Sequence, residues 1–399
     1  NYEMLLRHSE ESECPLDRKW VNAKVISLMN SNLIQLPAKP DCSMVSTLFL
    51  QKNENLSAVP PSFFTCMSTL KILDLCGTSI ESLPSSISIL TSLKALYLND
   101  CGRLVHIPEE IQQLRNLELL DICRSGIRGF PAVIGSITHL RCLRVSFTSV
   151  VRLEVNGIQA TPCETIQRLP HLEELTIDAD PKDPKWNIIA HSIAEKMADL
   201  EKLSTLSFCF PTTVSLESFI RTSKSWKNSS SQAGSNFRSF NIIVGSQKAR
   251  KFPALDVPKW SGQRYFQYSG GVDMPDVVKE VLRRTYAFEL IAHQSITNFS
   301  DLAFDGKECL KFCRVEGLVS IHSDDSFEWR ELQLIEILHC DELVNLPLST
   351  MNAAKLRCIR CNENWWGKVM VNDEVRANLQ RFCSFSQSEI RQIGSMTFP

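Results

Sequence analysis

The sequence predicts an α/β solenoid, a fold in which one short structural unit repeats along the chain and each copy packs against the next. Three observations support this prediction. A leucine-based pattern recurs every 23 to 25 residues between residues 45 and 145, a proline follows an apolar residue at the same place in successive units, and less regular copies of the pattern occur on both sides of this region. Repetition at this period indicates stacked strand–turn–helix units.

The strand of each unit has the pattern Leu-x-x-Leu-x-Leu. In the clearest unit these residues are Leu70, Leu73 and Leu75, and equivalent units open at Val45, Leu93, Leu117 and Leu140. Leu73 and Leu75 stand two residues apart, so in a strand their side chains point to one side and are buried together. The intervening residues therefore face the other way.

A turn and an arc complete each unit. A small or polar residue is expected to turn the chain and to bond the backbone of the neighbouring coil at Asn53, Thr78, Cys101 and Ser125. The pair Leu83 and Pro84 ends the following arc, because proline cannot donate to a ladder and fixes its own φ. Ile87 and Leu90 then lie one helical turn apart and pack onto the core. Since stacked strands lie about 4.8 Å apart and the arcs are thicker, the array must curve. The expected fold is a leucine-rich-repeat horseshoe with a parallel concave sheet and short helices or irregular arcs on the convex side.

The regularity of the pattern divides the chain. The predicted organisation is an N-terminal cap or the tail of a missing upstream domain at 1–20, regular repeats at 21–150, irregular repeats with insertions at 151–305, C-terminal repeats at 306–362 and a C-terminal cap at 363–399. A helix is expected across 188–200, and the polar segment 222–236 is predicted to be a flexible loop. No repeat template fits residues 250–305. In the cap, Trp365 and Trp366 are interpreted as packed side chains rather than a ligand platform.

Charge and cysteine content narrow the function classes. The chain has 43 basic and 45 acidic residues and a formal net charge of −2, which argues against nucleic acid as the main partner because neutralising phosphates requires a basic surface. No apolar run approaches about 18 residues, so no membrane span is expected. The fifteen cysteines are scattered and many lie inside hydrophobic patterns, which favours reduced thiols and a cytoplasmic location over disulfides. The chain opens on Asn1 without the apolar core of a signal peptide, which suggests a fragment.

Several residues resemble chemical sites, but their spacing argues against each site. Cys309 and Cys313 with Cys358 and Cys361 suggest zinc, yet residues three apart on a strand point to opposite faces and Cys313 takes a core-leucine position. His339 and Cys340 are neighbours on a strand and point apart, so they form no thiol–imidazole pair. We therefore expect no enzyme activity, no catalytic residue and no metal. A basic cluster is interpreted as a solvated loop, with docking to an acidic partner domain as the alternative: Lys248, Arg250, Lys251, Lys259 and Arg264.

The outward-facing strand positions remain as candidates for function, because the repeat leaves them free of structural duty. The register predicts that the concave face binds a partner through Phe49, Gln51, Asp74, Tyr97, Asn99, Asp121, Arg124, Arg144, Phe147, Glu174, Asp178, Arg314, Glu336, His339 and Arg360. Exposed aromatic and arginine side chains carry most of the energy of protein interfaces, so the preferred hot spots are Phe49, Tyr97, Arg144, Phe147 and Arg314.

Residues 25–147 resemble the repeat domain of intracellular plant nucleotide-binding leucine-rich-repeat disease-resistance receptors of the coiled-coil class. The resemblance is carried by Ile26-Ser-Leu-Met-Asn30, Leu36-Pro37, Leu70-Lys-Ile-Leu-Asp-Leu75, Ile80-Glu-Ser-Leu-Pro-Ser-Ser-Ile87 and Leu140-Arg-Cys-Leu-Arg-Val145. It implies a plant-defence sensor that recognises a pathogen effector or a guarded host protein and restrains the nucleotide switch of its receptor.

The sequence lacks the nucleotide-binding signatures of that family. It contains no Gly-x-x-x-x-Gly-Lys-[Ser/Thr] loop to hold phosphates and no Met-His-Asp signature. The resemblance therefore implies no cofactor in this chain: ADP or ATP would bind an upstream domain, which would also be an intramolecular partner.

Two other functions remain open. One is a free-standing cytosolic repeat scaffold or ubiquitin-ligase substrate adaptor. The other is a secreted inhibitor or receptor ectodomain, whose plant members usually carry a Gly-x-Ile-Pro turn. The residues before the prolines are instead Ser82-Leu83, His106-Ile107 and Gly129-Phe130, so that turn is not repeated.

Overall fold

The chain forms two compact units, Asn1–Ser239 and Phe240–Pro399. The computed structural model describes residues 4–6 and 20–385, apart from 128–129, 148–161, 229–236, 246–263, 271–273, 292–309, 317–327, 345 and 347. The two units are described separately below.

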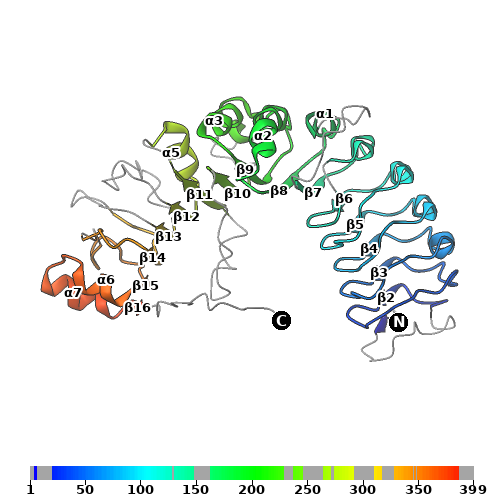
Figure 1. Cartoon of the computed structure of the whole chain (residues 1–399), viewed down its shortest axis with the longest axis horizontal. Coiled ribbons are helices and arrows are strands. Elements are labelled where there is room, and N and C mark those ends of the chain that lie inside the picture. Colours follow the sequence, from blue (N-terminus) through cyan, green and yellow to red (C-terminus); the bar gives the residue numbers. More distant parts are fainter. Residues whose placement is uncertain are drawn as a thin grey trace, which may run out of the picture. The chain divides into compact units, whose positions relative to one another are not determined.

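The first unit contains a parallel sheet whose strands pair in chain order (Figure 1). Its strands are β1 (Met4–Leu6), β2 (Val25–Ser27), β3 (Thr47–Phe49), β4 (Ile72–Asp74), β5 (Ala95–Tyr97), β6 (Leu119–Asp121), β7 (Cys142–Phe147), β8 (Glu174–Ala179) and β9 (Thr205–Phe210). The inward leucines of the pattern, such as Leu73 and Leu96, are fully buried, whereas their outward neighbours Ile72 and Asp74 are half-buried. The predicted fold class and strand alternation are confirmed in this unit.

Short 3-10 helices form the first arcs on the side of the unit opposite the strands (Figure 1). They are η2 (Phe63–Cys66), η3 (Ser85–Ile89), η4 (Glu109–Gln113) and η5 (Ala132–Ser136). The last three begin directly after Pro84, Pro108 and Pro131, whose φ values of −71°, −68° and −58° are those that the proline ring imposes. Proline therefore fixes the direction in which these arcs leave the preceding segment.

Longer α-helices replace these turns later in the first unit. They are α1 (Pro162–Gln167), α2 (Pro184–Met197), α3 (Thr213–Thr222) and α4 (Lys224–Asn228). Asp183 caps α2 by accepting the Lys185 N–H at 2.9 Å, and Thr212 caps α3 with Ser215. The larger arcs enclose a run of aromatic rings in contact: Phe147, Trp186, Phe208, Phe210 and Phe219.

The prediction of a flexible loop over 222–236 is wrong for its first part. Residues Lys224–Asn228 form α4, and Trp226 is fully buried against Phe237, with the ring centroids 5.1 Å apart. One large apolar side chain anchors this otherwise polar segment, because burying a tryptophan removes a large apolar area from water. Residues 229–236 lie outside the described part of the chain.

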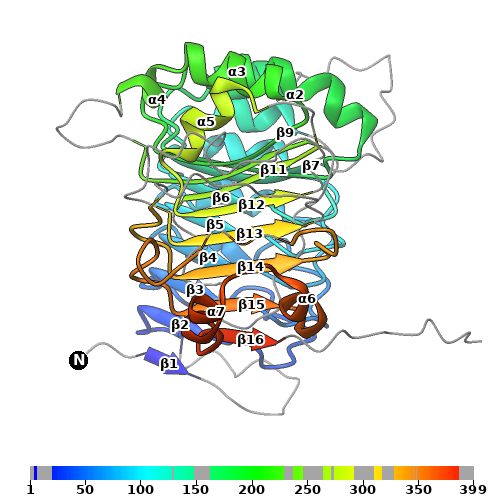
Figure 2. The same cartoon turned by 90° about the vertical axis from the view of Figure 1, so that its left-hand side faces the viewer.

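The second unit contains a parallel sheet with the same chain-order pairing, whose later strands stack as rungs in Figure 2. Its elements are β10 (Ser239–Val244), β11 (Arg264–Ser269), α5 (Asp276–Leu282), β12 (Ala287–Ile291), β13 (Phe312–Glu316), β14 (Leu334–Leu338), β15 (Cys358–Cys361), α6 (Glu363–Lys368), α7 (Asp373–Gln380) and β16 (Cys383–Phe385). Within the segment that fitted no repeat template, β11, α5 and β12 form a strand–helix–strand unit. Arg264, expected in a solvated loop, begins β11 and lies 5.1 Å from the Tyr286 ring.

The end of the second unit is a helical pair followed by one more strand. Trp365 and Trp366 are buried, and Trp365 Nε1 donates to the Leu343 carbonyl at 2.7 Å. The sequence placed the last repeat at residues 356–361, but β16 pairs in parallel with β15 and extends the sheet by one strand. Because β16 has three residues and lacks the leucine pattern, the repeat in the sequence did not predict it.

A single asparagine joins two coils of the first unit. The fully buried Asn53 side chain makes four hydrogen bonds: Oδ1 accepts the N–H groups of Ser31 and Leu33 at 3.0 Å each, and Nδ2 donates to the carbonyls of Leu28 and Leu50 at 2.8 and 2.7 Å. This bonding to the neighbouring coil is the role that the sequence predicted.

The later residues at this position do not all bridge two coils. Cys101 Sγ contacts the Leu75 carbonyl of the preceding coil at 3.1 Å. The hydroxyls of Thr78 and Ser125 instead donate to carbonyls of their own coils, Leu75 and Ile122. A hydroxyl has one proton and a short reach, so it cannot replace all the bonds of an amide.

Asn53→Ala is expected to lower the free energy of unfolding by about 2–4 kcal/mol, because it leaves several buried backbone groups without partners. The measurement is chemical denaturation followed by circular dichroism. Asn55→Ala, at an exposed position two residues away, should change the free energy by less than about 0.5 kcal/mol. Equal losses for the two variants would contradict this role for Asn53.

Candidate protein-binding face

The outward-facing side chains of the first unit form an open surface, here called the sheet face. Strand pairing aligns one residue from each of five coils into its central row: Phe49, Asp74, Tyr97, Asp121 and Arg144. All are half-buried except Asp121, which is 6% exposed. The sequence predicted each of these residues as a candidate, and the structure brings them together in one row.

An apolar row runs beside the central row, two residues nearer the start of each strand. It consists of Ile72, Ala95 and Leu119, which are register neighbours and half-buried. The sheet face therefore combines aromatic, aliphatic and charged groups on adjacent positions, which is the composition of protein interfaces.

Arg144 is the main cation of the central row. Its guanidinium lies 2.7 Å from Glu174 Oε1 and 3.4 Å from Asp121 Oδ2. Glu174 and Asp178 continue the outward side of β8 and are half-buried. Arg144 therefore joins three coils through two carboxylates while keeping part of its surface in solvent.

Asp74 is held by a backbone hydrogen bond, whereas Arg144 is held by two carboxylates. Oδ1 of Asp74 accepts the Cys76 N–H at 2.9 Å, and Asp121 accepts the Cys123 N–H at 3.0 Å in the same way. Burial raises the pKa of Asp74 and of Asp121 above the ordinary value, and the charge of Asp121 adds to the shift at Asp74. Keeping these carboxylates ionised on the sheet face therefore costs stability.

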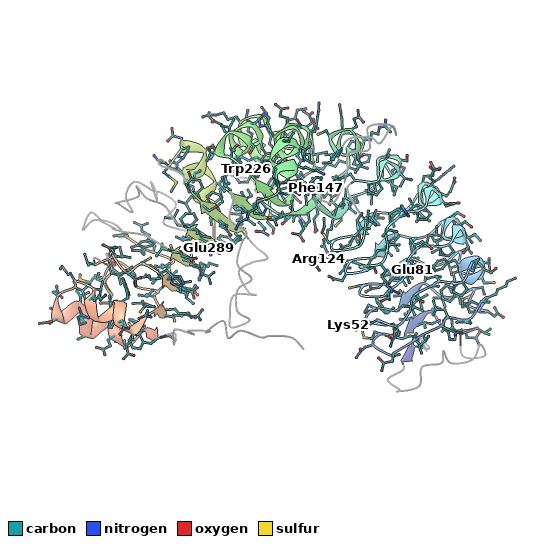
Figure 3. The ribbon with its side chains drawn as sticks, in the orientation of Figure 1. Lys52, Glu81, Arg124, Phe147, Trp226 and Glu289 are labelled. Atoms are coloured by element: carbon teal, nitrogen blue, oxygen red, sulfur yellow. The ribbon has the colours of Figure 1, made fainter. Side chains whose placement is uncertain are left out.

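A second group of charged residues lies at the turns that follow the strands. Lys52, Asp100 and Arg124 have φ values of 61°, 61° and 54°, in the left-handed region that non-glycine residues rarely adopt. Gly77 occupies the same place in the intervening coil with a φ of 66°. The N–H groups of Lys52, Gly77 and Asp100 donate to carbonyls of the next coil, and the Arg124 N–H donates to Ser146 Oγ of the next coil at 2.8 Å; these bonds hold the left-handed conformations. Figure 3 shows Lys52 and Arg124 on the strand side of the unit.

The turn residues extend the site beyond the sequence prediction, which named only Arg124 among them. Arg124 Nε lies 2.6 Å from Asp100 Oδ1, and Asn99 Nδ2 donates to Asp100 Oδ2 at 2.9 Å. The sequence did hold a signal for them: Lys52, Asp100 and Arg124 each stand one residue before the recurring turn residues Asn53, Cys101 and Ser125. Gln51, also predicted, is half-buried in the turn that follows β3.

Phe147 was predicted as an exposed hot spot, and this exposure is wrong. It is 8% exposed, with its ring centroid 5.4 Å from that of Trp186. The helix α2 supplies the tryptophan that covers it. Among the other predictions His339 is exposed, with a φ of 48°, and Arg360 is half-buried.

Arg314 and Glu336 were also predicted on an accessible face, and both are buried. The Arg314 guanidinium lies 3.1 Å from Glu289 Oε1 and 2.6 Å from Glu336 Oε2, and these side chains are 3%, 0% and 5% exposed. Arg360 lies 3.7 Å from Glu336, and the Tyr265 hydroxyl donates to Glu289 at 2.5 Å. Strand register aligns four side chains, here called the buried charge row although Arg360 at its end is half-buried: Glu289, Arg314, Glu336 and Arg360.

The signs in the buried charge row alternate, so every neighbour is an opposite charge. Beside it, Tyr265, Ala287 and Phe312 form a buried apolar cluster. The outward side of these strands in the second unit is therefore a packed interior, and we remove Arg314 and Glu336 from the candidate binding residues.

The described part of the chain holds no group of three or more His, Cys, Asp or Glu side chains arranged to bind a metal ion. Cys313 is fully buried in the core, Cys361 is buried, and Cys309 lies outside the described residues. None of the described helices is both long enough and apolar enough to span a bilayer.

The family of the chain follows from comparison with known proteins. A family model described as "Leucine-rich repeat region" matches residues 24–260. The chain belongs to the leucine-rich-repeat family. The sequence resemblance to the repeats of plant disease-resistance proteins is also confirmed, since the leucine-rich repeats match proteins of that name.

Two Arabidopsis thaliana proteins illustrate the match. Disease resistance protein SUMM2 is 40% identical over 88 residues, which are 22% of this chain and 10% of that protein. Disease resistance protein RFL1 is 38% identical over 105 residues, which are 26% of this chain and 12% of that protein. The aligned part of the leucine-rich-repeat chain therefore spans about a tenth of the length of each relative.

Solved structures support the leucine-rich-repeat fold. The Leptospira interrogans LRR protein LIC12759 has a TM-score of 0.54 at 16% identity, covering 92% of this chain and 96% of that one. The functional domain of InlJ from Listeria monocytogenes has a TM-score of 0.51 at 14% identity, covering 88% and 72%. At these identities the likeness concerns the fold alone.

Arg314→Met is expected to lower the free energy of unfolding by about 3–5 kcal/mol, because it leaves Glu289 and Glu336 buried without their cation. Thermal or denaturant unfolding measures the change. Arg330→Met, which removes an exposed pair with Glu328, is the control and should cost at most about 1 kcal/mol. Adding Glu289→Gln and Glu336→Gln to Arg314→Met should restore part of the loss. No restoration would contradict the electrostatic explanation.

Asp74→Asn is expected to raise the melting temperature at pH 7, because the raised pKa of Asp74 means that its charged form is less favourable in the folded than in the unfolded chain. This increase in melting temperature should vanish below pH 3.8, the ordinary aspartate pKa, because the wild-type carboxyl is then protonated in both the folded and the unfolded chain. Asp100→Asn should have the opposite effect at pH 7, since hydrogen bonding to Arg124 lowers the pKa of Asp100. Melting curves at both pH values test the pair, and a loss of stability in Asp74→Asn would contradict the assignment.

Proposed function

We propose that this chain is the recognition domain of a cytoplasmic plant immune receptor, and that its sheet face binds a protein: a pathogen effector or a guarded host protein. The observation that carries the proposal is the central row of the sheet face. Phe49, Tyr97 and Arg144 stay partly exposed on a surface whose inward side already provides the core. The names of the matching relatives support the immune role.

The shape and chemistry of the sheet face suit a protein better than a small molecule. Small-molecule sites are concave pockets that enclose most of their ligand. The sheet face instead spreads over successive coils, with an apolar row at Ile72, Ala95 and Leu119 beside charged groups. Protein interfaces combine an apolar centre with a polar rim, and aromatic and arginine residues carry most of their energy.

The cost of ionising Asp74 and Asp121 also supports a binding role. Sites that sacrifice stability in the free protein are commonly functional, because the partner supplies the missing interaction. A basic or hydrogen-bonding group of the partner, placed near Tyr97 between the two carboxylates, would supply it here. Restraint of a nucleotide switch would require contact with a nucleotide-binding domain of the receptor, and it forms part of the same proposal.

Tyr97→Ala is expected to weaken binding of the partner by about tenfold or more, because truncating a central aromatic anchor typically costs at least 1–2 kcal/mol. The partner is first trapped in plant cells by a photo-crosslinking amino acid at position 97, and then purified for calorimetry. Gln112→Ala, at an exposed position of η4, is the control and should leave the affinity unchanged. Circular dichroism checks that both variants fold.

Two results would count against the proposal. Unchanged affinity of folded Tyr97→Ala would remove the sheet face as the binding surface. Disruption of the gene without loss of resistance to any pathogen isolate would contradict the immune role, even if the sheet face binds a protein.

A further inference from the structure

A depression of about 420 Å³ lies on the edge of the first unit, where the strands begin, and nothing in the proposed function uses it. Its described lining, here called the edge pocket, consists of Arg115, Asn116, Glu118, His139, Arg141, His171, Glu173 and Lys202. All but Arg115 stand at two repeated positions relative to β6, β7, β8 and β9. Glu118, Arg141 and Glu173 come one residue before their strands, and Asn116, His139, His171 and Lys202 come three residues before theirs. The edge pocket is thus built by the same stacking that forms the sheet face, but on a different side of each coil.

The two carboxylates of the edge pocket are already neutralised. Arg141 binds Glu173 with two nitrogens, each 2.9 Å from a carboxylate oxygen, and lies 3.5 Å from Glu118. Lys94 approaches Glu118 to 2.9 Å. These contacts lower the pKa of both glutamates, so they are ionised and paired at neutral pH.

The second repeated position supplies a column of nitrogen groups. The His139 and His171 rings are nearly parallel, with an interplanar angle of 5° and centroids 6.4 Å apart. Lys202 Nζ lies 3.1 Å from His171 Nδ1. Because an ammonium group has no lone pair, His171 Nδ1 accepts this bond and the ring carries its proton on Nε2, which remains available as a donor.

Two cations of the edge pocket have no acidic partner within ion-pair distance among the described side chains: Arg115 and Lys202. The charged groups of the lining are Arg115, Arg141 and Lys202 against Glu118 and Glu173. Lys94 and Arg238 are further cations that act on these two glutamates. With Arg141 satisfied by the glutamates, an excess of positive charge and imidazole donors faces the cavity. An anion with several acceptor oxygens would neutralise Arg115 and Lys202 and accept hydrogen bonds from the imidazoles.

We propose that the edge pocket binds a phosphate group, either free in solution or carried by a phosphorylated side chain of a partner protein. A phosphate dianion matches the charges of Arg115 and Lys202 and accepts hydrogen bonds from the His171 and His139 rings. A carboxylate would bring half the charge and one fewer oxygen.

The test uses the full chain with its histidine ring carbons labelled with ¹³C, observed by NMR during titration with inorganic phosphate at constant ionic strength. The resonances of His139 and His171 should shift together and saturably, while the other histidines stay unchanged. His139→Gln and His171→Gln assign the two signals.

Pairs of variants test whether phosphate binds in the edge pocket. Lys202→Met should weaken phosphate binding at least about tenfold, whereas Lys182→Met, at an exposed lysine outside the pocket, should not. Glu173→Gln should tighten binding, because it removes a negative charge and releases Arg141 from its strongest partner. A peptide with phosphoserine, compared with the same peptide carrying serine or glutamate, distinguishes a phosphoprotein partner from free phosphate.

Specific results would overturn the proposal. These are equal shifts with chloride and with phosphate, no change of affinity in folded Lys202→Met, or weaker binding in Glu173→Gln. Tyr97→Ala should leave phosphate binding intact, so failure at the edge pocket and failure of the sheet face are distinguishable.

Discussion

The parallel pairing of each strand with the next, one coil after another, is the constraint on which the rest of the structure depends. Pairing in constant register places equivalent residues of successive coils side by side. It therefore turns single positions of the repeat into rows: the central row of the sheet face, the buried charge row of the second unit and the two columns of the edge pocket. A side chain in this fold acts with its neighbours in adjacent coils more than with its neighbours in sequence.

The sequence was sufficient to predict the strands and arcs of the regular repeats. Leu73 and Leu75 specify which side of the strand is buried, and the fixed φ of Pro84 marks where an arc turns into a 3-10 helix. The same alternation of residues along a strand could not show whether other parts of the chain cover its outward-facing side chains. Phe147 is covered by α2 and Arg314 lies in a packed interior, although their positions in the repeat match those of exposed residues. The alternation of apolar and polar residues shows to which side of the strand a side chain points, whereas its exposure depends on which other elements pack against that side.

The missed features share a physical cause. The buried Trp226 anchors α4 within a polar segment. Burial of this one side chain offsets the entropy lost on ordering the segment, but a single residue does not create a repeating hydrophobic pattern in the sequence. Lys52 and Asp100 hold left-handed turns because the next coil accepts their N–H groups, an interaction between coils that no local propensity records. His139 and His171 precede strands as variable positions, and only stacking brings the rings together.

The alternating signs of the buried charge row bear on how this protein can evolve. Families of repeats grow and shrink by unequal recombination, which removes or duplicates a coil. In the first unit a lost coil would still bring leucine against leucine, as at Leu73, Leu96 and Leu120. Loss of the coil that carries Arg314 would instead bring Glu289 against Glu336 in the interior. We therefore expect loss of a leucine-lined coil of the first unit to disturb the buried side of the sheet less than loss of the coil that carries Arg314.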